Sequence, residues 1–193
     1  AMGCAPSAVS ASRLDDGVVA ADRQQQQRPN EDIGTVAVTA SKAVGPAGRV
    51  FAVEPHPRTF GYLLQTVEVN DCGNTSCHNL AAADRTGKSN LTDELRKDDN
   101  NRIGPGPLVV NTITLPDFIR ENGIEHIDLL KIDVEGFEHA VISGLAGDEA
   151  NAGCIYVESI DRNLRKYGSS EVELRSLLNK LGFSVTKAQA YDD

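Results

Sequence analysis

The sequence predicts an α/β fold in which a mostly parallel sheet is covered by helices on both faces. Strand-like and helix-like segments alternate along the chain from about residue 33, and several strand-like segments are apolar throughout instead of alternating in polarity. Strands of that kind are buried on both faces, as they are in parallel sheets. Ligands of such sheets bind beside the carboxyl ends of the strands, so the polar residues that follow each strand are the candidates for a site.

Two helices and two strands are expected in the first half of the chain. Residues 35–44 carry apolar or small side chains at helical spacing and stop at a Gly-Pro pair. Residues 49–54 form an apolar strand that ends in an acid, and residues 57–70 place apolar side chains on one helical face. Residues 77–82 are expected to form the next strand.

The second half begins with a polar segment and then returns to alternating elements. Residues 93–107 are charged and rich in glycine and proline, which predicts a mobile loop. An apolar stretch follows at 108–115. Strands are expected over residues 127–132, 154–157 and 183–188. Helices are expected over residues 116–122, 137–145 and 169–181. The last of these helices begins with a capping box, Ser170 to Glu173.

The composition is typical of one soluble domain. The 193 residues fit a single domain, and a hydrophobic content of 40% is enough for a core. The formal net charge of -9 disfavours a nucleic-acid partner, because an acidic chain repels phosphate. No apolar run is long enough to span a membrane and no signal peptide is visible, so a cytoplasmic location is expected. Cys72 and Cys77 have no second pair, which favours reduced thiols over a zinc site.

Residues 1–31 have the composition of a disordered or atypical segment, with many Ala, Ser, Asp and Gln residues. The predicted domain therefore covers residues 32–193. Within the segment, Val18–Ala21 is apolar enough for a short strand. The residues that begin at Met2 also fit the pattern for N-myristoylation of Gly3.

Acidic residues follow three of the expected strands. Glu54 ends the strand at 49–54, where a carboxylate can accept hydrogen bonds from both hydroxyls of a ribose; the alternative is a solvated acid. Lys131, Asp133 and Glu135 come at the end of the strand at 127–132, and Glu158 should lie beside Asp133.

The cluster of these residues admits several roles. Lys131 lies in an apolar strand, so it needs an acidic partner. A lysine with two acids, here Asp133 and Glu135, can position a hydroxyl substrate, bind a divalent cation or act as a general base; the alternative is a structural ion-pair network. Nothing in the spacing demands a metal ion, and no metal is assigned.

Several motifs together resemble the FkbM-type methyltransferase family. They are V-E-P-H-P at 53–57, Asn70, Thr114-Leu115, and above all K-I-D-V-E-G-F-E at 131–138. The resemblance extends from about Ile33 to Phe183. It implies a Rossmann-like class I methyltransferase fold, S-adenosylmethionine as cofactor, and methyl transfer to the hydroxyl of a sugar or another small molecule.

The resemblance also implies roles for individual residues. Asp133, Glu135 and Lys131 would be catalytic, near the transferred methyl group and the acceptor, and Glu54 would bind the cofactor ribose. Ala82, Ala83 and Asp84, after the third strand, would lie near the adenine. The residues expected to contact the cofactor are Gly34, Glu54, Pro55, Ala83, Asp84 and Asp133.

The sequence departs from the family in the loop that follows the first strand. The family has a loop like D-x-G-A-N-x-G, whereas residues 28–34 read R-P-N-E-D-I-G, so only Ile33 and Gly34 fit. Pro29 cannot donate to a central ladder. The first strand and the cofactor loop are therefore expected to be degenerate, unless Val18–Ala21 supplies the strand.

Three interpretations of function follow. The first is an active methyltransferase, and the second is a catalytically impaired binding or scaffold module that has lost the cofactor loop. The third is a chain whose first strand has been replaced by unrelated sequence, which would leave a sheet edge for a homodimer to cover.

Overall fold

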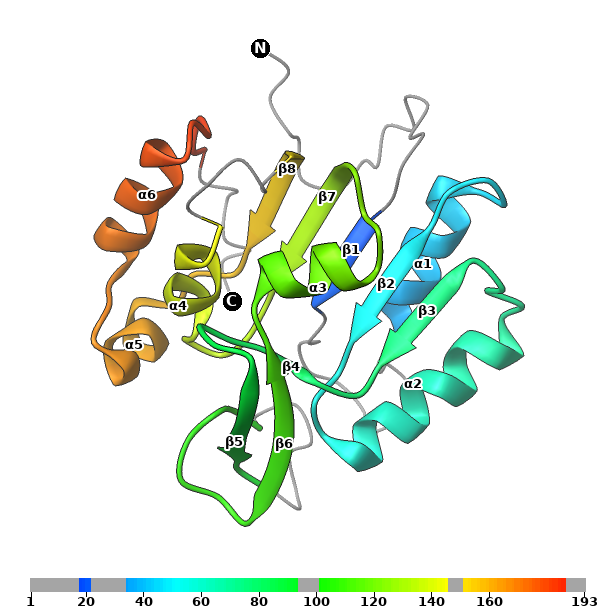
Figure 1. The fold of residues 1–193 in the computed structure, drawn as a ribbon, viewed down its shortest axis with the longest axis horizontal. Coiled ribbons are helices and arrows are strands. Elements are labelled where there is room, and N and C mark those ends of the chain that lie inside the picture. Colours follow the sequence, from blue (N-terminus) through cyan, green and yellow to red (C-terminus); the bar gives the residue numbers. More distant parts are fainter. Residues whose placement is uncertain (1–17, 22–33, 94–100, 146–150, 187–193) are drawn as a thin grey trace, which may run out of the picture.

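The centre of the molecule is a five-stranded sheet with the strand order β3-β2-β1-β7-β8. The computed structural model describes residues 18–21, 34–93, 101–145 and 151–186, and every pairing in this sheet is parallel (Figure 1). The strands are β1 (Val18–Ala21), β2 (Val50–Val53), β3 (Thr75–His78), β7 (Ile127–Ile132) and β8 (Ala152–Val157). The predicted parallel sheet is thus confirmed.

Strand β1 occupies the middle of this sheet. It pairs with β2 through Val18 and Val50 and with β7 through Val18 and Leu129. The short apolar run therefore does supply a central strand, which argues against a replaced first strand. Residues 22–33, which include most of the departing loop at 28–34, lie outside the described residues. The domain boundary at residue 32 stays a prediction.

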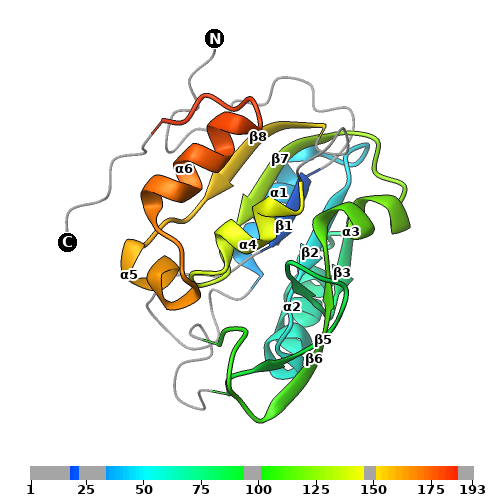
Figure 2. The same cartoon turned by 60° about the vertical axis from the view of Figure 1, so that its left-hand side comes forward.

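A second, smaller sheet extends beyond the carboxyl ends of the main strands. It consists of β4 (Ala81–Ala82), β5 (Gly87–Leu91) and β6 (Leu108–Ile113), in the order β4-β6-β5. Strand β6 is parallel to β4 and antiparallel to β5. Figure 2 shows β5 and β6 as a ribbon that leaves the main sheet; we call residues 87–93 and 101–113 the β5–β6 ribbon.

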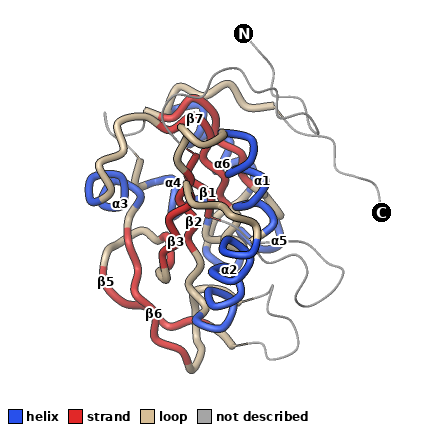
Figure 3. Tube along the Cα trace, turned by 90° about the vertical axis from the view of Figure 1, so that its right-hand side faces the viewer, coloured by secondary structure: helices blue, strands red, loops and turns tan. Residues whose placement is uncertain are grey.

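Helices lie on both faces of the main sheet, as predicted. They are α1 (Thr35–Val44), α2 (Pro57–Val69), α3 (Leu115–Glu121), α4 (Glu138–Ser143), α5 (Asp161–Leu164), the 3-10 helix η2 (Arg165–Tyr167) and α6 (Glu171–Lys180). Figure 3, which views the sheet from its side, shows α3 on one side and α1 and α2 on the other. The cap predicted at Ser170 is confirmed, because its hydroxyl accepts from the Glu173 N–H at 3.3 Å.

The alternation of side chains along β2 explains the two layers. Phe51 and Val53 point into the main core, which also contains Phe118 of α3 and Val141 of α4. Ala52 points to the opposite face and packs with residues of α1 and α2. Because successive strand residues face opposite sides, one apolar strand serves both layers.

The strand expected at 77–82 is wrong as a single element. Strand β3 ends at His78, and the Asn79 side chain then donates to the backbone oxygens of Glu54 and Pro55 at 2.9 and 3.2 Å. A side chain that bonds the neighbouring backbone competes with the ladder. The chain therefore turns, and Ala81–Ala82 joins the second sheet.

The strand expected at 183–188 is also wrong over its described residues, 183–186, which form no strand. The N–H of Gly182 bonds Asn179 O at 3.1 Å, and the N–H of Phe183 bonds Leu178 O at 3.0 Å. This pattern is a Schellman motif, and Gly182 has the positive φ of 91° that it requires. The apolar Phe183 therefore closes α6 and packs on the core.

Strand β5 and helix α5 were not expected from the sequence. Strand β5 is polar and exposed over most of its length, so it lacks an apolar signal. Helix α5 has only four residues. Among the described residues, no helix is long and apolar enough to cross a membrane.

Candidate functional site

A pocket of about 490 Å³, which includes the open space at its mouth, lies at the carboxyl ends of β2, β4 and β7. Its walls are apolar with a few polar groups, as is usual for small-molecule sites. The lining residues are Val53, Glu54, Pro55, Ala81, Ala82, Leu91, Asn101, Arg102, Ile103, Asp133, Val134 and Phe137. The pocket thus lies where parallel sheets bind ligands.

The connection from β2 to α2 holds the Glu54 carboxylate at this pocket. Glu54 Oε1 accepts from the His56 N–H at 2.7 Å, and the Glu54 N–H bonds His78 O at 3.0 Å. His56 is buried and caps α2, because its Nδ1 accepts from the Arg58 N–H at 3.2 Å. Its Nε2 lies 3.4 Å from Asp93 Oδ1. Glu54 is therefore anchored on one oxygen while its side chain lines the pocket.

Lys131, Asp133, Glu135 and Glu158 come together beside the pocket, as the sequence predicted. Lys131 Nζ donates to Asp133 Oδ2 at 3.1 Å, and the two side chains are only 16% and 9% exposed. Asp133, Glu135 and Glu158 each place one carboxylate oxygen within 4.8 Å of the others. The expected acidic partner of Lys131 is thus Asp133, which itself lines the pocket.

The turn from β7 to α4 has a strained backbone that brings Glu135 into this cluster. Glu135 has a φ of 56° and Gly136 a φ of 106°, both in the left-handed region. A Cβ on Gly136 would lie 2.3 Å from Asn163 O, so only glycine fits there. Glu138 Oε1 accepts from the N–H groups of Val134 and Gly136 at 3.2 and 2.9 Å.

Asn163 of α5 links this turn to η2 through two side-chain hydrogen bonds. Its Nδ2 donates to Glu135 Oε2 at 3.0 Å, and its Oδ1 accepts from Lys166 Nζ at 2.8 Å. Asn163 is 6% exposed. The buried amide therefore fixes the direction of the Glu135 carboxylate.

Burial changes the protonation of two carboxyl groups here. Desolvation raises the pKa of Glu158 to about 7. The Asp133 charge, a side-chain hydrogen bond with Asp133 and the Glu135 charge raise this pKa further, and Lys131 lowers it. Desolvation also raises the pKa of Glu138, although the N–H groups that bond it act in the opposite direction. Glu158 therefore titrates near neutral pH, where a proton acceptor works best.

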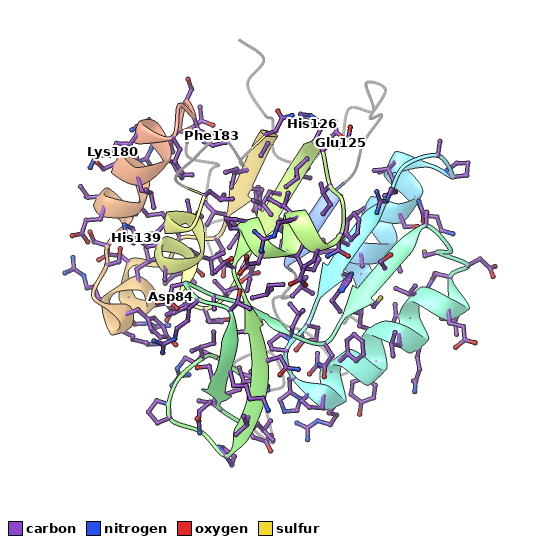
Figure 4. The ribbon with its side chains drawn as sticks, in the orientation of Figure 1. Asp84, Glu125, His126, His139, Lys180 and Phe183 are labelled. Carbon is purple, nitrogen blue, oxygen red and sulfur yellow. The ribbon has the colours of Figure 1, made fainter. Side chains whose placement is uncertain are left out.

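The structure places the predicted residues unevenly. Glu54, Pro55 and Asp133 line the pocket, and Glu135 and Lys131 lie beside it. Ala83 is buried with its N–H on Ile113 O, and Asp84 is exposed on the turn after β4 (Figure 4). Neither is among the lining residues described above, whereas the neighbouring Ala82 is.

Gly34 serves a packing role in the structure. It precedes α1 with a φ of 85°, and a Cβ there would lie 3.1 Å from Thr66 Cβ of α2. Gly34 is not among the lining residues of the pocket. Its cofactor contact stays a prediction, because the rest of its loop lies outside the described residues.

Other site residues were missed by sequence reasoning. Asn101, Arg102 and Ile103 line the pocket although they fall in the segment expected to be a mobile loop. Ile103 bridges to Leu91, and Asn101 is 5% exposed. No motif marked these positions or Asn163. Glu138 did have a signal, because it closes the K-I-D-V-E-G-F-E motif.

The fold is a Rossmann-like α/β fold with a pocket at the strand ends, where proteins of this class bind small ligands. The family model described as the methyltransferase FkbM domain matches residues 18–185. The chain therefore belongs to this family of S-adenosylmethionine-dependent methyltransferases.

Individual relatives match over shorter stretches or at low identity. The 2-O-methyltransferase NoeI of Sinorhizobium fredii is 37% identical over 76 residues, which are 39% of this chain and 30% of NoeI. A SAM-dependent methyltransferase from Aquifex aeolicus has 14% identity and a TM-score of 0.47, with 91% of this chain and 76% of that chain covered. The fibrillarin pre-rRNA processing protein of Methanococcus jannaschii has 13% identity and a TM-score of 0.45, with 90% and 59% covered.

Proposed function

We propose that this chain transfers a methyl group from S-adenosylmethionine to a hydroxyl group of a sugar or another small molecule. The observation that carries the proposal is one pocket lined by both Glu54 and Asp133, which follow β2 and β7, the two strands that flank β1. Family membership supports the cofactor. The partial match to a 2-O-methyltransferase supports a hydroxyl acceptor.

The residues of the pocket fit this cofactor. A nucleoside needs apolar walls for its base and an acceptor for its ribose hydroxyls, and the pocket offers Ala82, Ile103 and Phe137 beside the Glu54 carboxylate. Asp133 Oδ1 is buried and has no hydrogen-bond partner among the described residues, so it awaits a donor. Glu54 would hold the ribose, and Ala82 would contact the adenine in place of the more remote Asp84.

The bound cofactor supplies an electrophilic methyl group on a sulfonium. The chain's own residues then have three tasks. The apolar lining excludes water. The hydrogen-bonded turns that hold Glu54 and Glu135 align the reactants. A carboxylate of the acidic cluster accepts the hydroxyl proton. Lys131 holds Asp133 in place for this role through the contact at 3.1 Å.

Calorimetric titration with S-adenosylhomocysteine tests the proposal. We expect micromolar binding to the wild-type protein. Glu54→Ala should weaken it by about tenfold or more, because a charged acceptor of ribose hydroxyls is lost. Glu68→Ala, which removes an exposed acid elsewhere on α2, is the matched control and should bind as the wild type does. If millimolar ligand does not bind, the impaired binding module becomes the better interpretation.

A further inference from the structure

The Asp133 carboxylate has one oxygen that is satisfied and one that is not. Oδ2 accepts from Lys131 Nζ at 3.1 Å. Oδ1 is buried without a hydrogen-bond partner among the described residues, and the side chain as a whole is 9% exposed. A buried acceptor without a donor is costly, so this position calls for a donor from a neighbour or a ligand.

Glu158 is placed to supply that donor when it carries a proton. It follows β8, and its N–H bonds Ile132 O at 3.1 Å, which holds it beside the residue that follows β7. One oxygen of Glu158 lies within 4.8 Å of oxygens of Asp133 and Glu135. Two adjacent carboxylates in a half-buried site favour a shared proton over two full charges. The raised pKa of Glu158, about 7, agrees with this geometry.

The charged groups around the pair come from several elements. Lys131 lowers and Glu135 raises the pKa of Glu158. On the α5 side, two successive hydrogen bonds through Asn163 connect Lys166 of η2 to Glu135. Glu54 and Arg102 also line the pocket that Asp133 lines. The buried Glu138 is the first residue of α4, and the Asp133 charge further raises the pKa of Glu138.

We propose that Asp133 and Glu158 form a proton-sharing pair that takes the proton of the acceptor hydroxyl as the cofactor loses its charge. This inference rests on the proposed function. In the reaction the acceptor oxygen bonds the methyl carbon, and the carbon–sulfur bond breaks with its electron pair on sulfur. The acceptor O–H bond also breaks, and its proton goes to the pair. One positive charge leaves the cofactor and one arrives on the pair, so the charge of the site stays constant.

If the charge of the site stays constant during the reaction, the pair should also affect cofactor binding when no acceptor is present. The doubly ionised pair should favour the positively charged S-adenosylmethionine, whereas the protonated pair should favour the neutral S-adenosylhomocysteine. Because the pair loses its proton as pH rises through about 7, the preference for S-adenosylmethionine should grow between pH 6 and pH 8. A coupling of one pKa unit between charge states corresponds to about a tenfold change in this preference.

Calorimetry of both cofactor forms at the two pH values tests the pair. In the wild-type protein, the ratio of the two dissociation constants should change by about fivefold to tenfold. Glu158→Gln should make the ratio independent of pH. Glu125→Gln is the matched control and should behave as the wild type does, because Glu125 is an exposed acid at the opposite end of β7 (Figure 4).

The possible results distinguish a failure of the pair from a failure of the proposed function. Binding of both ligands with a ratio that does not change with pH would overturn the pair and leave the methyltransferase function standing. The pair would also be overturned if Glu158→Gln keeps the pH dependence, or if the ratio at fixed pH responds to Mg²⁺ and to a chelator, which would indicate a cation in place of the proton. Absence of binding by either ligand would overturn both proposals.

Discussion

The turn from β7 to α4 and the β5–β6 ribbon both contribute to the pocket, but they are built in different ways. In the turn, side chains determine the backbone: Glu138 accepts from two N–H groups, and Asn163 fixes Glu135. In the ribbon, backbone bonds such as Thr92 N–H to Arg102 O at 3.0 Å hold the pocket-lining segment, and the Thr92 and Tyr167 hydroxyls bond its backbone as well.

This difference decides what a sequence reveals. Side-chain bonds demand particular residues at fixed spacing, so the turn has a motif of eight residues that can be recognised. Backbone bonds can form with almost any side chain, so the ribbon has no comparable pattern. The pocket residues of the turn can therefore be predicted from the sequence, whereas those of the ribbon cannot.

Substitution at Gly136 should give the largest effect and tests how firmly side chains fix the turn. A Cβ there would lie 2.3 Å from the backbone oxygen of Asn163, and the φ of 106° adds strain. Gly136→Ala should lower the free energy of unfolding by about 3 kcal/mol or more, measured by urea denaturation. It should also weaken S-adenosylhomocysteine binding, because Glu135 and its neighbours move.

Gly123→Ala is the matched control for the contact. Gly123 has a positive φ of 58° but nothing within 4 Å of an added Cβ. Strain alone should therefore cost about 1 kcal/mol. If the two variants lose equal free energy of unfolding, the backbone at Asn163 can move to accept the added Cβ. The contrast between a fixed turn and an adaptable ribbon would then be wrong.

Most of the main sheet and one side of the site could be predicted from the sequence. Apolar runs gave β2 and β7, and helical spacing gave α1 and α2 within about one residue of their observed ends. The acidic cluster followed from the rule that parallel strands end at one edge, which brings Glu158 beside Asp133 although they are far apart in sequence.

The rest could not be predicted, for reasons that the structure makes specific. Leu80 and the alanines after it look like a continuation of β3, yet a bond from Asn79 to the backbone diverts the chain. Phe183 is an aromatic residue typical of strands, but its N–H bonds Leu178 O in the motif that ends α6. Asn101 lies among polar residues typical of a loop, and only the tertiary fold buries it.

Glu138 gives a second test, of intermediate size, of side-chain control in the turn. It is 2% exposed and accepts from the N–H groups of Val134 and Gly136. Glu138→Ala should lower the free energy of unfolding by about 2 kcal/mol, because two buried donors lose their acceptor. Glu138→Gln keeps an oxygen for them and should cost less in the same denaturation experiment. A Gln variant as unstable as the Ala variant would mean that the charge, and not the acceptor, holds the turn.

Tyr167 contacts both the turn and the ribbon, and its substitution should have the smallest and most local effect on stability. Its ring packs on Phe137 with centroids 5.1 Å apart, and its hydroxyl donates to Ile103 O at 2.5 Å. Tyr167→Phe keeps the ring and removes only the bond, so it should cost about 1 kcal/mol of global stability. If the ribbon depends on such backbone attachments, amide exchange should accelerate around Ile103 and stay unchanged at Gly136. Tyr156→Phe, at a half-exposed position on β8, is the control and should alter neither. Faster exchange at Gly136 as well would mean that turn and ribbon open as one unit, so that the two walls of the pocket differ in their bonding but not in their stability.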